Sequence, residues 1–281
     1  MKNSVTAQLQ RHQRFLATLV LCLPALAHLF PILYMLSLSF KSATEVFEYP
    51  PNLIPAAFDF ANYVTAIKAA PLARFLLNSL IVSLSVTALQ LVTSILAAFA
   101  LARIEFPGKK FFLAVILATM MVPGEVTILP NYLTIARLGW LDTYRSMIVP
   151  SAASGFGVFL LYQFFRTIPT ELEEAVRVDG GSRFRFLWQF VVPLSMPAIV
   201  AFGVYAFVAT WNQYLWPLVV TQTTEMRTVQ IALGMFRSEN EASSWGVIMA
   251  ATAILVAPSI LLFVATQKQF VRGIMMSGIK G

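Results

Sequence analysis

The sequence predicts an all-α integral membrane protein with six transmembrane helices and with its N- and C-termini in the cytoplasm. The 281 residues are 58% hydrophobic and only 12% charged, whereas soluble domains carry about 25% charged residues. Several charge-poor stretches reach the roughly 18 residues that cross a bilayer as a helix. Most of the 20 lysines and arginines fall in alternate loops, and the positive-inside rule places those loops in the cytoplasm.

The first predicted span covers residues 15–40, which hold no charged residue and follow a polar, basic segment at 1–14. A secretory signal peptide is the alternative interpretation. The apolar run is longer than the apolar region of such peptides, and it shows no clear small-residue cleavage site. Pro24 and Pro31 are compatible with a span, because neighbouring helices can satisfy the carbonyls that these prolines free.

The remaining spans are predicted at 76–101, 111–135, 146–165, 194–220 and 245–266. Prolines in the loop at 41–74 block a continuous helix there. The third span is interrupted at Pro123-Gly124-Glu125. The chain is therefore predicted to consist of a cytoplasmic N-terminus at 1–14, a first helix and extracytoplasmic loop at 15–73, a five-helix membrane core at 74–268 and a cytoplasmic tail at 269–281.

Composition argues against several kinds of function. Cys22 is the only cysteine, so no internal disulfide can form. His12 and His28 are isolated, and no metal site with Cys/His ligand spacing is present. His28 lies in an apolar run, where packing or a backbone hydrogen bond is favoured over proton relay. The basic residues are spread in small groups, which does not favour nucleic-acid binding.

A polar segment at 169–193 stands between two apolar runs and falls on the cytoplasmic side. Thr170 and Glu173 have the spacing of a capping box. Gly180, followed by a second glycine, predicts the end of that helix, because glycine readily adopts the left-handed conformation. Ser182 is then expected to cap a second short helix that ends at Pro193. The predicted shape is two short helices joined by a glycine bend.

Two interpretations of this segment remain open on physical grounds. It can dock into a groove on a partner protein and transmit a push. It can equally lie on the lipid surface, with Arg183 and Arg185 near anionic headgroups.

The spacing within the segment resembles the EAA loop of bacterial ABC importer permeases, which reads Glu-Ala-Ala-x3-Gly-x9-Ile-x-Leu-Pro. This chain has Glu174-Ala175-Val176, Gly180 and Phe190-x-Val192-Pro193. Its departures at positions 176, 190 and 192 exchange one apolar residue for another. Further blocks look like the carbohydrate-uptake branch: Ser39-Phe40-Lys41, Pro50-Pro51, Asn62-Tyr63, Asn78-Ser79, Val122-Pro123, Pro130, residues 211–218 and residues 269–281. The whole chain is similar to the smaller six-span permease of the maltose importer and to its glycerol-phosphate counterpart.

The resemblance implies a type I ABC importer permease fold and a multi-pass protein of the bacterial inner membrane. In that family two permease subunits form the pore, two copies of a separate ATPase bind the cytoplasmic face, and an extracytoplasmic solute-binding protein delivers the solute. The chain would be a pore subunit in contact with membrane lipid and not an enzyme. It would hold no cofactor of its own, with ATP and Mg on the ATPase, and it has no GxxxxGK[ST] phosphate loop.

The same resemblance implies which residues face the ATPase. The EAA loop would be the coupling helix, with its contacts at Glu174, Ala175, Arg177, Asp179 and Gly180. The tail would reach between the ATPase subunits through Arg272, Gly273 and Lys280.

The solute path is less clearly marked. Glu125 is the one carboxylate well inside a predicted span, and an ionisable group at that depth is a functional candidate; exposure to outward water is the alternative. Other candidates for hydrogen bonding or stacking with a sugar-like solute are Asn78, Asn131, Trp211, Asn212, Gln213, Tyr214 and Trp216. Interhelical hydrogen bonds and interfacial anchoring are the alternative roles for them, and in the maltose system the partner permease holds the sugar.

The main rival function is an ion-coupled secondary transporter of a small polar solute. Such proteins usually carry several acids or histidines within the membrane, whereas only Glu125 and His28 qualify here. The solute itself stays open between a neutral sugar, an oligosaccharide, a glycosylated polyol and glycerol phosphate. The nearly neutral outward loops favour a neutral sugar, because they offer no strong attraction for phosphate.

Overall fold

The computed structural model describes residues 2–239 and 245–278, with side chains described mainly over 20–236 and 245–262. The described part of the chain is helical and contains no strand, which confirms the all-α prediction. It forms two compact units, one of residues 1–71 with 235–255 and the other of residues 72–234 with 256–281.

The first unit is built on a long N-terminal helix and a packed loop. Its elements are α1 (Lys2–Ser39), α2 (Ala43–Val46), α3 (Ala61–Ala69), the end of α14 (Val229–Glu239) and the start of α15 (Trp245–Gly278). Asn62 Nδ2 donates hydrogen bonds to the backbone oxygens of Ser39 (3.0 Å) and Lys41 (2.8 Å). Lys41 is only 2% exposed, and its ammonium group donates to the carbonyl of Asn52. The loop after the first span is therefore fixed by backbone-directed polar contacts.

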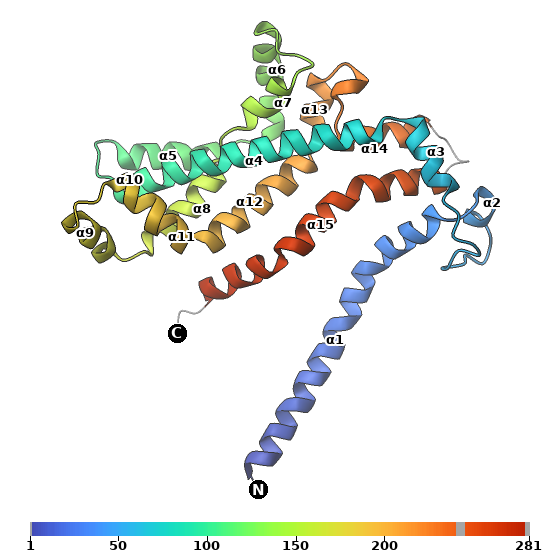
Figure 1. Ribbon diagram of the computed structural model, residues 1–281, viewed down its shortest axis with the longest axis horizontal. Helices are drawn as coiled ribbons and strands as arrows, with labels where there is room; N and C mark the ends of the chain where they lie inside the picture. The colour runs from blue at the N-terminus through green and yellow to red at the C-terminus, as the bar shows by residue number, and fades with distance from the viewer. Residues whose placement is uncertain (1, 240–244, 279–281) are drawn as a thin grey trace. The chain divides into compact units, whose positions relative to one another are not determined.

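The second unit is built on α4 (Leu72–Arg103), which packs along α8 (Gly155–Arg166) and α12 (Met196–Trp211), as Figure 1 shows. Gly157 permits this close approach, because a Cβ atom there would lie 2.2 Å from the ring of Phe202 and 2.6 Å from Ser94 Oγ. Small residues at helix contacts are the usual way in which membrane helices approach closely.

Three pairs of helices in the second unit are sharply bent at short breaks. The remaining elements of this unit are α5 (Lys109–Thr119), η1 (Gly124–Thr127), α6 (Ile128–Arg137), α7 (Tyr144–Ile148), η2 (Val149–Ser151), α9 (Thr170–Val178), α10 (Arg183–Phe186), η3 (Leu187–Val191), α11 (Val192–Leu194), α13 (Leu215–Val220) and η4 (Thr224–Met226). The bends are 95° between α5 and the η1–α6 pair, 41° before α8, and 78° between α11 and α12. In Figure 1, α6, α7 and α13 gather near the middle of α4.

The membrane prediction agrees with these helices. Within the described residues, Val20–Ser39, Leu72–Arg103 and Trp245–Leu262 are long and apolar enough to cross a membrane. Each of the three bent pairs reaches the same length and hydropathy when its halves are taken together, which gives up to six spans. The predicted third span, 111–135, is interrupted where its proline and glycine stand, but the bend is so large that α5 and α6 do not share an axis.

The predicted fifth span, 194–220, is also divided. Helix α12 ends at Trp211, and α13 begins only at Leu215. Of the residues between them, Gln213 and Tyr214 line a cavity described below. The break contains no proline or glycine and consists of Asn212, Gln213 and Tyr214.

Candidate functional site

The polar segment at 169–193, here called the coupling segment, lies beside the C-terminal end of α4 (Figure 1). Its first helix, α9, begins at Thr170, with Pro169 in extended conformation as the residue before it. No side chain caps this end, so the predicted capping box between Thr170 and Glu173 is wrong. Proline takes the capping position and leaves Thr170 inside the first turn, where its hydroxyl cannot reach the orphan N–H groups.

The glycine bend forms as predicted. Gly180 has a φ of +71°, and its N–H donates to the carbonyl of Arg177 at 3.0 Å. The N–H of Gly181 donates to Val176 O at 2.8 Å, which completes a Schellman motif. Ser182 Oγ then accepts a hydrogen bond from the N–H of Arg185 at 3.2 Å and caps the second helix. The bend is thus held by backbone geometry and one serine.

The second helix does not end at Pro193 as expected. It continues as a π-helical turn, in which the N–H of Val192 donates to Leu187 O, and it ends at Leu194. The bend follows at Ser195, which is fully buried. Proline lacks the N–H that an α-helix would use one turn earlier, and the wider π turn accommodates that loss.

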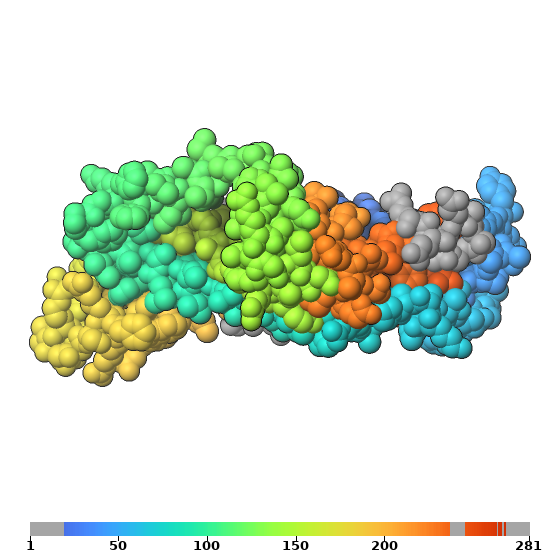
Figure 2. All heavy atoms as spheres, turned by 90° about the horizontal axis from the view of Figure 1, so that it is seen from above, coloured from blue at the N-terminus to red at the C-terminus, as the bar shows by residue number. Residues whose placement is uncertain are grey.

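Two faces of α9 have opposite roles. Val176, 8% exposed, packs with Leu172 against the hydrophobic core. The opposite face presents Glu174 and Ala175, both exposed, and Val178, which is 87% exposed. An apolar side chain with that much exposure marks a contact surface when it sits among polar neighbours. In Figure 2 this segment forms the yellow lobe.

All five residues predicted for the ATPase contact are exposed on the coupling segment: Glu174, Ala175, Arg177, Asp179 and Gly180. Arg177 also forms an ion pair with Glu173 at 3.5 Å, four residues earlier. This pair turns Glu173 toward the protein, where its side chain is 13% exposed, and leaves Arg177 68% exposed. The structure therefore leaves Glu174 without a partner among the described residues and available at the surface.

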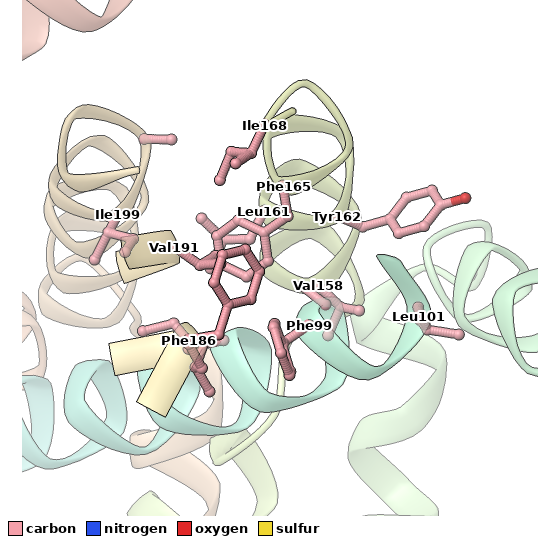
Figure 3. Close-up of a cluster of buried hydrophobic side chains, with 14 of the residues drawn as sticks. Phe99, Leu101, Val158, Leu161, Tyr162, Phe165, Ile168, Phe186, Val191 and Ile199 are labelled. Carbon is pink, nitrogen blue, oxygen red and sulfur yellow. The ribbon is translucent and has the colours of Figure 1, made fainter. Parts of the chain in front are cut away.

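The coupling segment is anchored to the membrane core. Phe186 and Val191, both fully buried, point toward Phe99, Leu161 and Phe165 (Figure 3). Arg103, at the end of α4, donates hydrogen bonds from Nη2 to the carbonyls of Phe165 (2.6 Å) and Ile168 (2.5 Å). These are the last residues of α8 and its connection to α9. A movement of the coupling segment would therefore be passed to α4, α8 and α12.

A cavity of about 370 Å³ lies among η1, α6, η2 and the break between α12 and α13. It is called the Glu125 cavity and is lined by Gly124, Glu125, Thr127, Ile128, Asn131, Pro150, Ser151, Gln213, Tyr214, Leu215 and Trp216. A neighbouring cavity of about 220 Å³ shares Ser151 and Gln213 with it. The two cavities are therefore adjacent in the second unit.

The structure brings together some of the predicted solute residues and separates others. Glu125, Asn131, Gln213, Tyr214 and Trp216 all line the Glu125 cavity. The Trp216 indole N–H, however, is already bonded to Ser146 O at 2.9 Å.

Three other predicted solute residues do not line either cavity. Asn78 is fully buried, and its amide bonds Glu225 O, Arg227 O and Tyr144 Oη at 2.7–2.8 Å. Trp211, 2% exposed, stacks on Phe207 with ring centroids 5.6 Å apart. Asn212 Oδ1 accepts a hydrogen bond from Gln230 at 3.1 Å.

The sequence interpretation missed part of the lining. Pro150 and Ser151 end η2 near the start of the predicted fourth span and line one wall of the Glu125 cavity. Pro150 could have indicated this break in the sequence, because a proline interrupts a helix, as Pro123 does in the third span. Gln90, Ser154 and Thr210 in the second cavity had no distinguishing pattern.

Asp142 holds the loop beside α13 in place. Its Oδ1 accepts hydrogen bonds from the N–H groups of Gln222 (2.9 Å) and Thr223 (3.1 Å), and Oδ2 accepts one from Thr223 Oγ1 (2.7 Å). Partial burial alone would raise the pKa of Asp142, but these three bonds together outweigh it and hold the pKa below its ordinary value. Asp142 also has a φ of +58°, which asparagine and aspartate tolerate best.

The predicted tail contacts cannot be placed in the same way. The backbone of Arg272 and Gly273 lies in α15, but their side-chain surroundings and the whole of Lys280 lie outside the described residues.

Residues 90–276 match a protein family described as binding-protein-dependent transport system inner membrane component. A similar protein from Agrobacterium fabrum, the sn-glycerol-3-phosphate transport system permease protein UgpE, is 37% identical over 93% of this chain and 95% of its own length. The protein of the same name from Brucella melitensis is 37% identical over 91% of this chain and 94% of its own length.

Two solved structures are similar as well. A chain of a bacterial ABC transporter involved in the import of the acidic polysaccharide alginate matches 92% of this chain and 97% of its own, with a TM-score of 0.82 and 25% identity. A chain of a bacterial alginate ABC transporter in complex with a periplasmic protein that holds an alginate pentasaccharide matches 92% and 96%, with a TM-score of 0.62 and 16% identity. The second match supports the fold alone.

Proposed function

Because this chain belongs to the family of binding-protein-dependent transport system inner membrane components, we propose that it conducts a sugar or sugar-like solute through the Glu125 cavity under the drive of an ATPase docked on α9. The chain is a permease subunit of an ABC importer, a multi-pass protein of the bacterial inner membrane and not an enzyme. It works with a second permease, an ATPase and an extracytoplasmic solute-binding protein. This places it apart from ion-coupled secondary transporters.

One observation carries the proposed solute path. Four polar side chains, those of Glu125, Asn131, Gln213 and Tyr214, line one cavity of the second unit, with Gln213 half-buried and the other three exposed. Within the described part of the chain, none of the four side chains forms a hydrogen bond or an ion pair. Unpaired polar groups at such a site are costly unless they face water or a ligand. A polyhydroxylated solute provides the donors and acceptors that these groups lack.

The proposed ATPase contact rests on the exposed face of α9. Glu174 and Ala175 stand beside the exposed Val178, which gives a short helix with both charge and apolar surface to offer a groove. The Schellman bend after α9 and the hydrogen bonds from Arg103 before it fix both ends of this helix. The helix can therefore transmit a movement of the ATPase to the membrane helices. ATP and Mg are expected on the ATPase, because the sequence has no phosphate loop of its own.

The solute class follows from the relatives. The solutes named for them are sn-glycerol-3-phosphate and the acidic polysaccharide alginate, both of which are polyhydroxylated. A sugar or sugar-like solute is therefore proposed for this chain.

The test is transport by the complete importer in proteoliposomes. The solute captured by the associated binding protein is first identified by mass spectrometry of the purified binding protein, and uptake of that solute is then measured with ATP enclosed. Glu174→Arg is expected to abolish uptake and solute-stimulated ATP hydrolysis. Glu105→Arg alters an exposed glutamate outside the coupling segment and is the matched control. Wild-type uptake and stimulation in Glu174→Arg would contradict the proposed docking.

A further inference from the structure

The Glu125 cavity has an unusual charge pattern. Among the residues that line it and the neighbouring cavity, all of them described, Glu125 is the only acid, and there is no lysine, arginine or histidine. Its carboxylate has no recorded ion pair in the described part of the chain. A cavity with one sign of charge and low-dielectric walls concentrates its field on whatever enters.

The backbone turn that carries Glu125 is held in place by local hydrogen bonds. Pro123 has an extended backbone with a ψ of 133° and directly precedes η1. The N–H of Val126 donates to Pro123 O at 3.2 Å, and Thr127 Oγ1 donates to Gly124 O at 2.7 Å. The turn that carries Glu125 is thus tied by two hydrogen bonds at the 95° bend. The backbone position of Glu125 is thus fixed at the edge of the cavity, while its side chain is exposed.

The surrounding groups are suited to an uncharged solute. The side-chain amides of Asn131 and Gln213 and the hydroxyl of Tyr214 can each donate and accept hydrogen bonds. An ionised glutamate can only accept, from up to four directions, which fits the hydroxyl groups of a sugar or polyol. A phosphate or carboxylate on the solute would find no cation here and would face the charge of Glu125.

We infer that Glu125 is a specificity-determining residue that admits uncharged polyhydroxylated solutes to this cavity and disfavours anionic ones. The inference rests on the proposed function and narrows its solute class. The inferred solute is uncharged, whereas the solutes named for the relatives, glycerol phosphate and an acidic polysaccharide, are both anionic. It also agrees with the nearly neutral outward loops.

The test measures the electrostatic effect of Glu125 on charged reagents in the cavity, and it needs no solute-binding protein. In a Cys22→Ser background, which removes the only cysteine of this chain, Gln213→Cys places one thiol in both cavities. The full importer complex in detergent is treated with a sulfonate-bearing or a trimethylammonium-bearing methanethiosulfonate reagent. Intact mass of this subunit gives each rate, and the rate with uncharged methyl methanethiosulfonate corrects for access.

With Glu125 present, the cationic reagent is expected to react faster than the anionic one. Glu125→Gln should lower the cation-to-anion rate ratio about tenfold, as expected for a nearby charge that is only partly screened. Glu105→Gln removes an exposed carboxylate from outside the cavity and should leave the ratio unchanged. A second reporter, Ser151→Cys, repeats the measurement from another wall and guards against a local effect of Gln213→Cys.

Each alternative result has a defined meaning. An unchanged ratio in Glu125→Gln with both reporters would overturn the inference, and so would thiols that react with none of the three reagents. A failed inference leaves the proposed function standing if Glu174→Arg still abolishes uptake. Conversely, a tenfold shift together with normal uptake by Glu174→Arg would support the charge filter and contradict the proposed ATPase docking.

Discussion

Arg103 Nη2 donates a hydrogen bond to the backbone carbonyl of Ile168 at 2.5 Å. The same nitrogen bonds the carbonyl of Phe165 at 2.6 Å, so one guanidinium closes the end of α8 just before the coupling segment. The last carbonyls of a helix lack intrahelical partners, and a cation near them is also favoured by the helix dipole. The end of α4 is thereby joined to the start of the proposed ATPase contact.

We expect Arg103→Ala to loosen this joint and to reduce coupling. The carbonyls of two buried residues lose a charged donor, which costs about 1–3 kcal/mol of stability. The midpoint of thermal unfolding of the purified complex should fall, and more ATP should be hydrolysed for each solute imported. Both quantities are measured on reconstituted wild-type and variant importers.

The control is Arg166→Ala, which removes an exposed arginine that lies over the ring of Tyr162 at 5.6 Å and bonds no helix end. It should leave the ratio of hydrolysis to uptake as in the wild type. Equal ratios in Arg103→Ala and the wild type would show that the guanidinium is not part of the coupling route.

Gly180→Pro should abolish uptake. Proline fixes φ near −65°, whereas Gly180 needs +71°, so the Schellman bend cannot form and α10 is displaced. Gly180→Ala is expected to be milder, with partial uptake, because a left-handed alanine costs about 1 kcal/mol. Gly203→Ala, whose added methyl would only meet Leu91 side-chain atoms at 3.4 and 3.9 Å, is the control. Full uptake by Gly180→Pro in the same assay would rule out a role for the bend.

The bend was predictable from sequence because its cause is local. A glycine pair after a nine-residue helix and a serine before the next one determine the backbone with few tertiary contacts. Two features of the segment differ from the prediction, the residue that caps α9 and the end of the second helix. Each was shifted by one residue relative to the residue type that was expected to set it. Pro169 took the cap that Thr170 was expected to provide, and the π turn carried the helix past Pro193.

The residues that line the Glu125 cavity were only partly predictable, because their positions depend on how distant segments pack. Helix α12 is apolar on all sides, so its pattern does not tell which face is buried. Trp211 turned inward, while Gln213 and Tyr214, two and three residues later, came to line the cavity. The wall at Ser151 comes from a distant part of the chain, and only the fold brings it to Gln213.

Asn78 and Gln213 should respond oppositely to replacement by alanine. The amide of Asn78 joins α4 to residues 144, 225 and 227, so Asn78→Ala should lower stability by about 1–3 kcal/mol through unsatisfied buried groups. Gln213 has no recorded side-chain partner in the described part of the chain and lines the cavity. Gln213→Ala should keep stability and raise the KM for uptake about two- to tenfold, the value of one hydrogen bond. Thermal unfolding and uptake kinetics separate the two outcomes, and a stable Asn78→Ala with raised KM would reverse the assignment.

Asp142 should make stability depend on pH in the acidic range. Its folded-state pKa lies below the ordinary value, so its contribution is present above the ordinary pKa and is lost as the pH falls through the folded value. The unfolding midpoint of the wild type should therefore approach that of Asp142→Asn as the pH is lowered below about 4. Asp142→Ala also loses the neutral acceptor and should remain lower at every pH. A difference between wild type and Asp142→Asn that grows toward acid would contradict the hydrogen-bonding explanation.

Gly157→Ala should destabilise the second unit, because an added methyl would lie 2.2 and 2.5 Å from ring atoms of Phe202. Phe202 is fully buried and its ring cannot move freely in a close-packed core. Overpacking of this kind costs about 1–3 kcal/mol, and it should appear as a lower unfolding midpoint of the purified complex. Phe202→Leu removes the ring atoms in question, so Gly157→Ala should be less harmful in that background than in the wild type. If the two losses instead add without compensation, the close approach of α8 and α12 at Gly157 is not what requires a glycine at this position.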